Sequence, residues 1–153
     1  MQTDIGKKAF TGNPALESLR ILIGTWKSEG THPLTPDLTL HGRSSFSWLA
    51  DGAFLIWQSE LDAQPFPDGI AIFGSDDSNE QYYLLYFDER KVSRKYEVSI
   101  KQNLITWWRN APEFSQRYTW TISEDGNTIT GKGEIAKDGS TWEQDLNLTY
   151  TRI

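Results

Sequence analysis

The stretch GTWKSEGTH, residues 24–32, decides the fold. It begins with a glycine, as a β-strand entry often does, and it holds a tryptophan, Trp26, among small and polar neighbours. An indole is stable inside a protein only when other parts of the chain cover its large apolar surface. We therefore interpret Trp26 as a plug that closes one end of a β-barrel built to hold something.

The composition also favours β-structure. Of the 153 residues, 13% are aromatic, with seven Trp, seven Phe and six Tyr, and aromatic side chains suit the pleated, half-buried surface of a sheet. The length suits one compact domain, which we place over residues 1–153, with residues 1–12 as a loosely ordered N-terminal segment.

Periodicity separates one helix from a series of strands. In NPALESLRILIG, Asn13 can cap a helix, Pro14 suits its first turn and Gly24 ends it, while leucines recur at spacings of three. From Thr25 onward, short apolar segments alternate with turn signals such as Asp-Gly, which indicates an antiparallel meander. The predicted strands are 24–32, 38–49, 53–61, 68–75, 81–88, 91–101, 103–110, 115–124, 127–136 and 141–152.

The predicted fold class is all-β: a closed antiparallel up-and-down β-barrel of about ten strands with a short N-terminal helix. Strands with one apolar face either pack as two sheets or close on themselves, and closure removes the exposed edges that aggregate. Eight strands leave an interior that side chains just fill, whereas about ten leave room for a small ligand. A cavity and a packed core both stay open as descriptions of the interior.

Alternation with a period of two assigns inward side chains on two strands. In KVSRKYEVSIK, Arg94 and Tyr96 share the inward face with valine and isoleucine. In STWEQDLNLTYTRI, Gln144 falls on the inward face and Asp145 on the opposite, solvated face.

Aromatic residues supply further wall candidates. Trp57, Trp107 and Trp108 offer large apolar area, which in a barrel is either core or binding wall. The segments FLIWQSEL and YYLLYF, the second of which contains Tyr86, are apolar on both faces and cannot be oriented by periodicity. Gln116, Tyr118 and Trp120 share an inward face unless a register slip of one residue turns Arg117 and Thr119 inward instead.

The two ends of the barrel segment resemble a known arrangement. The triplet Gly24-Thr25-Trp26 after a short helix, together with Arg152 near the end of the last strand, is similar to lipocalin-type (calycin) barrels. The resemblance implies that Trp26 closes one barrel end and that Arg152 lies across its ring. There a guanidinium gains cation–π attraction and donates hydrogen bonds to carbonyls.

Longer stretches extend the resemblance from about residue 16 to the end. FSWLADGAFL, YYLLYFDERKVSRKYEV, FSQRYTWTISEDGNTITGKGE and DGSTWEQDLNLTYTRI resemble an uncharacterised bacterial family of lipocalin-like domains. LIGTWKSEG is more distantly similar to nitrobindin-like haem-binding barrels, which hold ferric haem through a histidine on a late strand. The histidines here are His32 and His41, so haem would need a tyrosine or an early histidine as its ligand. We expect no cofactor.

Arg94 is the sharpest candidate for ligand recognition. A buried unpaired cation is costly, so Arg94 pairs with an acid such as Asp88 or Glu89, lies at the barrel mouth, or meets an anionic ligand. His32 shares its inward parity with Trp26 but lies beside the loop THPLTPD. The predicted ligand-binding residues are His32, Trp57, Tyr86, Arg94, Tyr96, Trp108, Tyr118 and Gln144, and Trp26 and Arg152 are predicted to close the barrel.

Three hypotheses for function follow. The leading one is a non-enzymatic module that binds a small, mostly apolar or amphipathic molecule, with an anionic end met by Arg94. The second is an isomerase or lyase in which Tyr96, Tyr86 or Arg94 polarises a substrate in the same pocket. No GxSxG, HExxH or phosphate-loop motif is present, and no catalytic or metal-ligating residue is assigned. The third is a packed domain that pairs with itself through its aromatic strands as a homodimer.

Charge and hydropathy argue against two classes of partner. Fifteen basic and 21 acidic side chains leave a net charge of −6, which does not suit a polyanion, so we expect no nucleic acid. No apolar run is long enough to span a bilayer, and MQTDIGKKAF lacks the apolar core of a signal peptide, so we expect a cytoplasmic protein without a membrane partner. The lack of cysteine agrees with a reducing compartment.

Overall fold

The computed structural model describes residues 10–78 and 80–153. Within these ranges the chain forms a 3₁₀ helix followed by ten strands, and none of its helical segments is long and apolar enough to cross a bilayer. The elements are η2 (Pro14–Leu22), β1 (Gly24–Thr31), β2 (Leu40–Leu49), β3 (Phe54–Leu61), β4 (Gly69–Asp76), β5 (Gln81–Asp88), β6 (Ser93–Lys101), β7 (Leu104–Arg109), β8 (Ser115–Ile122), β9 (Thr128–Ala136) and β10 (Glu143–Arg152).

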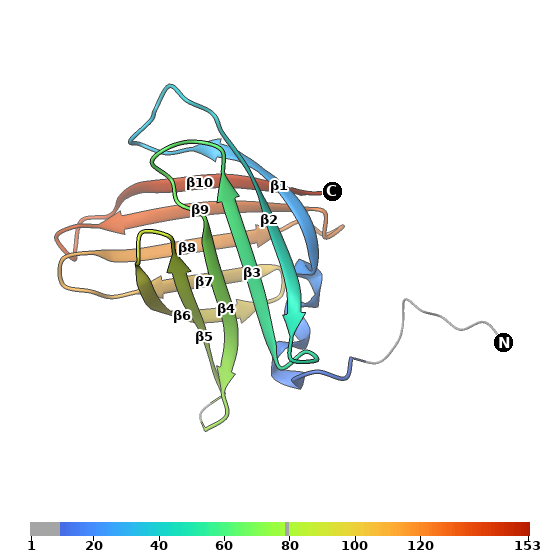
Figure 1. Ribbon diagram of the computed structural model, residues 1–153. Coiled ribbons are helices and arrows are strands. Elements are labelled where there is room, and N and C mark those ends of the chain that lie inside the picture. Colours follow the sequence, from blue (N-terminus) through green and yellow to red (C-terminus); the bar gives the residue numbers. More distant parts are fainter. Residues whose placement is uncertain (1–9, 79) are drawn as a thin grey trace.

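The strands close into an antiparallel barrel (Figure 1). Each strand pairs with the next one along the chain, and β1 pairs with β10, where Trp26 lies opposite Arg152. The predicted fold class is confirmed. Each predicted strand boundary lies within two residues of the observed one, because turn residues punctuate the chain wherever it reverses.

The helix η2 covers one end of the barrel (Figure 1). Asn13 caps its first turn, as predicted, by accepting a hydrogen bond from a backbone N–H of that turn. Leu16, Leu19 and Leu22 are fully buried. Their spacing of three equals the period of a 3₁₀ helix, so the three side chains form one row that faces the barrel interior.

Trp26 is completely buried at this end. Its indole N–H donates to a backbone carbonyl of the helix at 2.8 Å, and the Arg152 guanidinium carbon lies 4.1 Å from the centroid of its ring. Arg152 also donates to the carbonyls of Ile21 at 2.5 Å, Ile23 at 2.6 Å and Gly126 at 2.8 Å. The predicted contact between Trp26 and Arg152 is therefore present, and it joins the helix, the first strand, the last strand and a hairpin.

The segment predicted to be loosely ordered, residues 1–12, lies outside the described residues as far as residue 9. From residue 10 the chain packs on the barrel, since the Phe10 ring centroid is 5.0 Å from that of Trp48. The backbone N–H of Asn13 then donates to the carbonyl of Gly52 at 2.9 Å, which fixes the entry to the helix.

Strand β10 departs from regular alternation. Its register with β9 shifts between Gln144 and Asn147, as in a β-bulge, where an extra residue on one strand re-aims the side chains around it. Asp145 consequently points inward and is only 9% exposed, whereas Gln144 is exposed. The predictions of an inward Gln144 and a solvated Asp145 are both wrong for this reason.

Candidate functional site

The barrel interior contains a cavity of about 160 Å³. A cavity of about 150 Å³ accommodates a benzene molecule, so this one has room for roughly a single ring. The lining includes Phe66, Pro67 and Arg90, which belong to the β3–β4 and β5–β6 connections at the end of the barrel opposite η2. The cavity therefore has one end sealed by the helix and one end bordered by loops.

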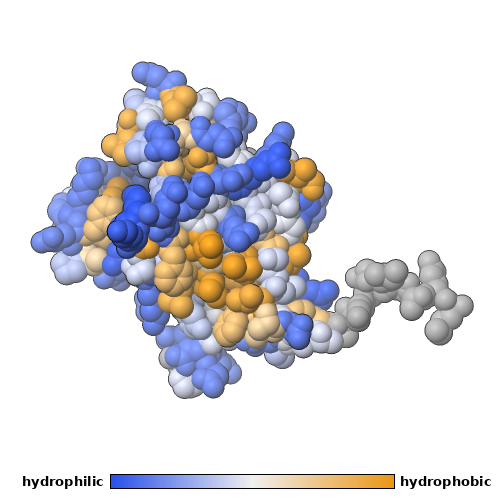
Figure 2. Space-filling view, viewed as in Figure 1, coloured by the Kyte–Doolittle hydropathy of each residue, from blue (hydrophilic) through white to orange (hydrophobic). Residues whose placement is uncertain are grey.

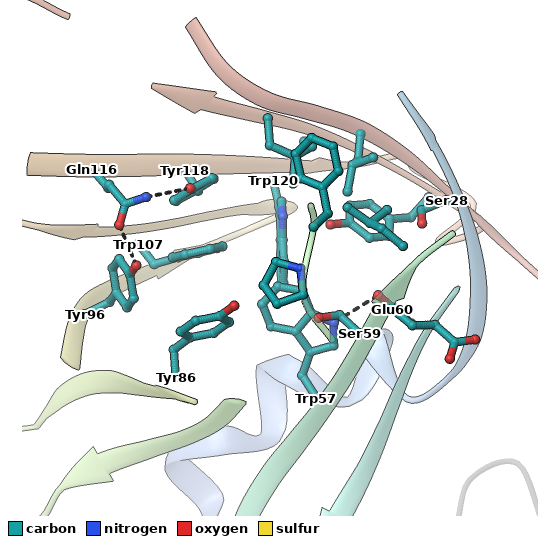
Figure 3. Close-up of a pocket in the computed structure, with 18 of the residues that line it drawn as sticks. Ser28, Trp57, Ser59, Glu60, Tyr86, Tyr96, Trp107, Gln116, Tyr118 and Trp120 are labelled. Atoms are coloured by element: carbon teal, nitrogen blue, oxygen red, sulfur yellow. Dashed lines mark hydrogen bonds between the residues drawn. The ribbon is translucent and has the colours of Figure 1, made fainter. Parts of the chain in front are cut away.

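Tryptophan rings form the apolar wall of the cavity (Figure 3). Trp57 and Trp120 meet edge to face with ring centroids 4.9 Å apart, and Trp107 stacks on Tyr118 at 4.0 Å. The Trp57 indole N–H donates to the hydroxyl of Ser44 at 3.0 Å. By contrast, the buried indole nitrogen of Trp107 has no hydrogen-bond partner among the described residues, so this wall holds an unused donor.

Polar side chains gather on the side of the cavity nearer the loops. The Gln116 side-chain carbonyl accepts from the Tyr96 hydroxyl at 2.7 Å and from the Arg94 guanidinium at 3.0 Å. The amide nitrogen of Gln116 donates to the hydroxyl of Tyr118 at 3.0 Å. Figure 3 shows Gln116 between the two tyrosines. Because the carbonyl already accepts twice, its orientation is fixed by its neighbours.

Arg94 has a neutral hydrogen-bond partner and an aromatic one. Its guanidinium carbon lies 5.0 Å from the ring centroid of Phe114. Within residues 10–78 and 80–153, Arg94 forms no ion pair with a carboxylate. The two acids that were considered as partners are engaged elsewhere: Asp88 pairs with Arg90 at 2.7 Å, and Glu89 accepts from the backbone N–H of Asp68. The alternative of an internal ion pair for Arg94 is therefore wrong.

The network continues from Tyr118 to the end of β1. The Tyr118 hydroxyl donates to Asp145 at 2.7 Å, and His32 Nε2 lies 2.8 Å from the other carboxylate oxygen. The backbone N–H of Leu34 donates to His32 Nδ1 at 3.0 Å, so Nδ1 is an acceptor and Nε2 carries the proton that is donated to Asp145. Burial, followed by the charge of Asp145, raises the pKa of Tyr118 well above its usual value. Tyr118 is thus a neutral donor.

Two further tyrosines complete the lining. Burial raises the pKa of Tyr86, whose hydroxyl donates to Asp88 at 2.8 Å. Hydrogen bonds from Arg90 lower the pKa of Asp88 to about 2, so this carboxyl is ionised at neutral pH. Burial also raises the pKa of Tyr150, which is 4% exposed and makes no hydrogen bond through its hydroxyl to any described residue. Tyr150 is a second unused donor.

The structure brings together most of the predicted site residues. Those that line the cavity are Trp57, Tyr86, Arg94, Tyr96 and Tyr118. Their contact with a ligand stays a prediction. His32 does not line the cavity itself; it contacts Asp145 and the ring of the lining residue Phe66.

Two predicted site residues lie elsewhere. Trp108 falls on the outer face of β7, because its neighbour Trp107 takes the inward position and successive side chains of a strand point to opposite faces. Gln144 is turned outward by the bulge in β10. Their assignment to the cavity wall was wrong.

Other lining residues were missed. Tyr150 has an inward parity that the sequence already shows, but the predicted site does not include it. Arg90 lies in a hairpin, where alternation gives no direction. Asp145 reaches the network only through the bulge, for which the sequence offers no clear signal.

The residues present do not fit haem. Neither histidine of the chain lines the cavity in the described structure, and a space for roughly one ring is much too small for a macrocycle of four pyrroles. No group of His, Asp and Glu suited to a metal ion occurs in the described part of the chain.

No model of a known protein family matches the chain, and no curated protein matches it in sequence. Among solved structures, the crystal structure of Rv2717c from M. tuberculosis is similar, with a TM-score of 0.67 and 15% identity. The match covers 93% of this chain and 99% of that chain. At this identity the likeness shows the fold alone. It is consistent with a lipocalin-like barrel, and the resemblance to a bacterial lipocalin-like family or to nitrobindins stays a prediction.

Proposed function

We propose that the barrel binds a small, mostly apolar molecule with an anionic end. The apolar part lies deep, against Trp57 and Trp120, and the anionic end lies beside Arg94. The observation that carries this proposal is the state of Arg94: a guanidinium that lines an aromatic cavity and is held by the neutral amide of Gln116. A cation without an internal acid is the natural partner of an anion from outside.

The charges around the cavity support an anionic ligand. The chain as a whole carries −6, yet the charged side chains that line the cavity from the inner face are Arg90 and Arg94, since Glu60 and Lys132 have the outward parity of their strands and are exposed. Arg90 is neutralised by Asp88, which leaves Arg94 as the cation nearest the polar cluster. Asp145 lies behind Tyr118, whereas Arg94 lines the cavity itself and can contact an anion directly.

The hydrogen-bond groups support the same class of ligand. The cavity wall holds hydrogen-bond donors that have no acceptor among the described residues: the Trp107 indole, the Tyr150 hydroxyl and the remaining N–H groups of Arg94. A carboxylate offers acceptors only. The size of the cavity favours a monocyclic carboxylic acid, with benzoate as the simplest member of the class.

Tyr86 and Tyr96, which polarise the substrate in the enzyme hypothesis, are better suited to binding than to catalysis. Burial raises the pKa values of Tyr86 and Tyr96, so both are neutral donors at neutral pH and neither is a base. Their hydroxyls are also engaged with Asp88 and Gln116. Such groups hold and orient a ligand.

The test compares benzoate with benzamide, its neutral counterpart of nearly equal shape, by calorimetry and by quenching of Trp fluorescence. A charge-assisted hydrogen bond is worth about 1.5–3 kcal/mol, so the native chain should prefer the acid by roughly 10- to 100-fold. Arg94→Gln should abolish this preference and leave the affinity for benzamide unchanged. Arg43→Gln, on the exposed outer face of β2, is the matched control and should bind like the native chain. Equal affinity of the native chain for acid and amide would contradict the proposed anion contact, and the absence of binding by either would remove the proposal.

A further inference from the structure

The outer face of the barrel bears an apolar patch over β3, β4 and β5, in front in Figure 2. Phe54, Ile70 and Phe87 are 39%, 41% and 44% exposed, and the others are partly buried. We call these residues the outer patch: Phe54, Ile56, Ile70, Ile72, Leu85 and Phe87.

The strand registers make the outer patch continuous. Ile56, Ile72 and Leu85 lie opposite one another across the three strands, and Ile70 lies opposite Phe87 in the next row. Side chains that are directly opposite on one face of a sheet lie about 5 Å apart at their Cβ atoms. The outer patch is therefore one surface and not a set of isolated exposed residues.

The six residues of the outer patch carry no charge. Between Phe54 and Leu85, the ring of Tyr83 lies across Gly74, where an added Cβ would come within 2.5 Å of the tyrosine hydroxyl oxygen. This arrangement fills the face around Gly74. Charged residues border the outer patch on both sides: Lys95 lies opposite Leu85 on β6, and Glu60 on β3 lies opposite Arg43 on β2, beside a hollow that Ile70 also lines.

We infer that the outer patch is the contact surface of a homodimer, an inference independent of the cavity. Side chains of this size carry about 200 Å² each, so the exposed fractions of Phe54, Ile70 and Phe87 leave on the order of 250 Å² of apolar area on the patch, to which its partly buried members add. A stable dimer buries about 800 Å² per partner, of which about 65% is apolar in a homodimer. The three exposed side chains supply about half of that apolar core, and neutral residues around the patch, such as Ser47 and Gln58 on β2 and β3, supply a polar rim.

The chemistry of the outer patch favours a second copy over other partners. The barrel is closed, so it offers no free strand edge to which a peptide could add. The residues of the patch carry no charge, so a charged partner has nothing to pair with on them. Two identical faces of twisted sheets pack well against each other, and a two-fold axis makes the surface its own complement.

The test is the mass of the intact chain in solution, measured by light scattering after gel filtration and by analytical ultracentrifugation over a range of concentrations. The native chain should have about twice the mass of one chain, 17.5 kDa. Ile70→Lys and Phe87→Lys each place an ammonium on both sides of the interface. Each should raise the dissociation constant of the dimer about 100-fold or more.

The control is Thr130→Lys, an exposed position on β9 across the barrel from β4. It should leave the dimer intact. Near-ultraviolet circular dichroism checks that every variant is folded. If one of the two lysine variants does not fold, the other still tests the interface. A native chain that is monomeric at all concentrations would overturn the inference. A dimer that persists in both folded lysine variants would overturn it equally, because the contact would then lie on another surface.

Discussion

Removal of the Arg152 guanidinium should be among the most damaging single changes to the barrel. In Arg152→Ala, three backbone carbonyls at the closed end lose their donor, and the Trp26 ring loses a cation at 4.1 Å. A hydrogen bond with one charged partner contributes about 1.5 kcal/mol or more, and a partly buried cation–π contact about 1 kcal/mol. Water replaces some of the lost donors because Arg152 is only partly buried. We expect a loss of about 4 kcal/mol, a large fraction of the stability of a small domain.

The assay is urea unfolding followed by far-ultraviolet circular dichroism, which does not depend on the fluorescence of Trp26. Arg152→Lys keeps the charge but has no planar fork of donors, so it should lose about half as much stability. Arg20→Ala removes an exposed arginine of η2 whose ion pair to Glu17 spans 3.8 Å and whose guanidinium carbon lies 5.5 Å from the Phe10 ring centroid, and it should cost about 1 kcal/mol or less. If Arg152→Ala costs no more than this control, the guanidinium does not hold the barrel end and the reasoning fails.

Two further predictions concern the acids near the mouth of the cavity. Asp145→Asn should lower the free energy of unfolding by about 2 kcal/mol, because a neutral amide cannot accept charge-assisted hydrogen bonds from both Tyr118 and His32; a variant as stable as the native chain in urea would contradict the network. Asp88 should make the free energy of unfolding depend on pH, because its pKa falls from 3.8 to about 2 on folding. The contribution of Asp88 is present above about pH 4 and is lost as the pH falls toward 2. The half-exposed Arg90 limits this contribution to about 1 kcal/mol, and urea midpoints of Asp88→Asn should lack the loss between pH 4 and pH 2 that the native chain shows.

The architecture could be predicted because its signals are local. Turn residues such as Asp51-Gly52 mark the hairpins, and the spacing between them limits each strand to one crossing of a barrel. The closure could be predicted from the exposed edges that an open sheet would leave, and the contact between Trp26 and Arg152 from the resemblance of both ends of the barrel segment to lipocalin-type barrels.

The site could be predicted only where alternation is regular. Arg94 and Tyr96 lie on an undisturbed strand and point inward as expected. Gln144 and Asp145 lie beside a bulge, where one extra residue reverses the faces. The pair Trp107-Trp108 shows a different limit, because parity says that one indole faces inward but does not say which one. The engagement of Asp88 by Arg90 instead of Arg94 depends on the path of a hairpin.

The position of Arg94 also explains how a cation can line the barrel without an internal acid. The helix, Trp26 and Arg152 seal the opposite end, so we expect the proposed ligand to enter on the side of the loops, where Phe66 and Arg90 border the cavity. A guanidinium deep against the tryptophans would lose its hydration and need a permanent counter-ion. Near the loops, water can satisfy its free N–H groups when the cavity holds no ligand. In the binding mode that we propose, an arriving carboxylate would displace water instead of breaking an ion pair, which would keep the cost of binding low while the apolar end of the ligand leaves water.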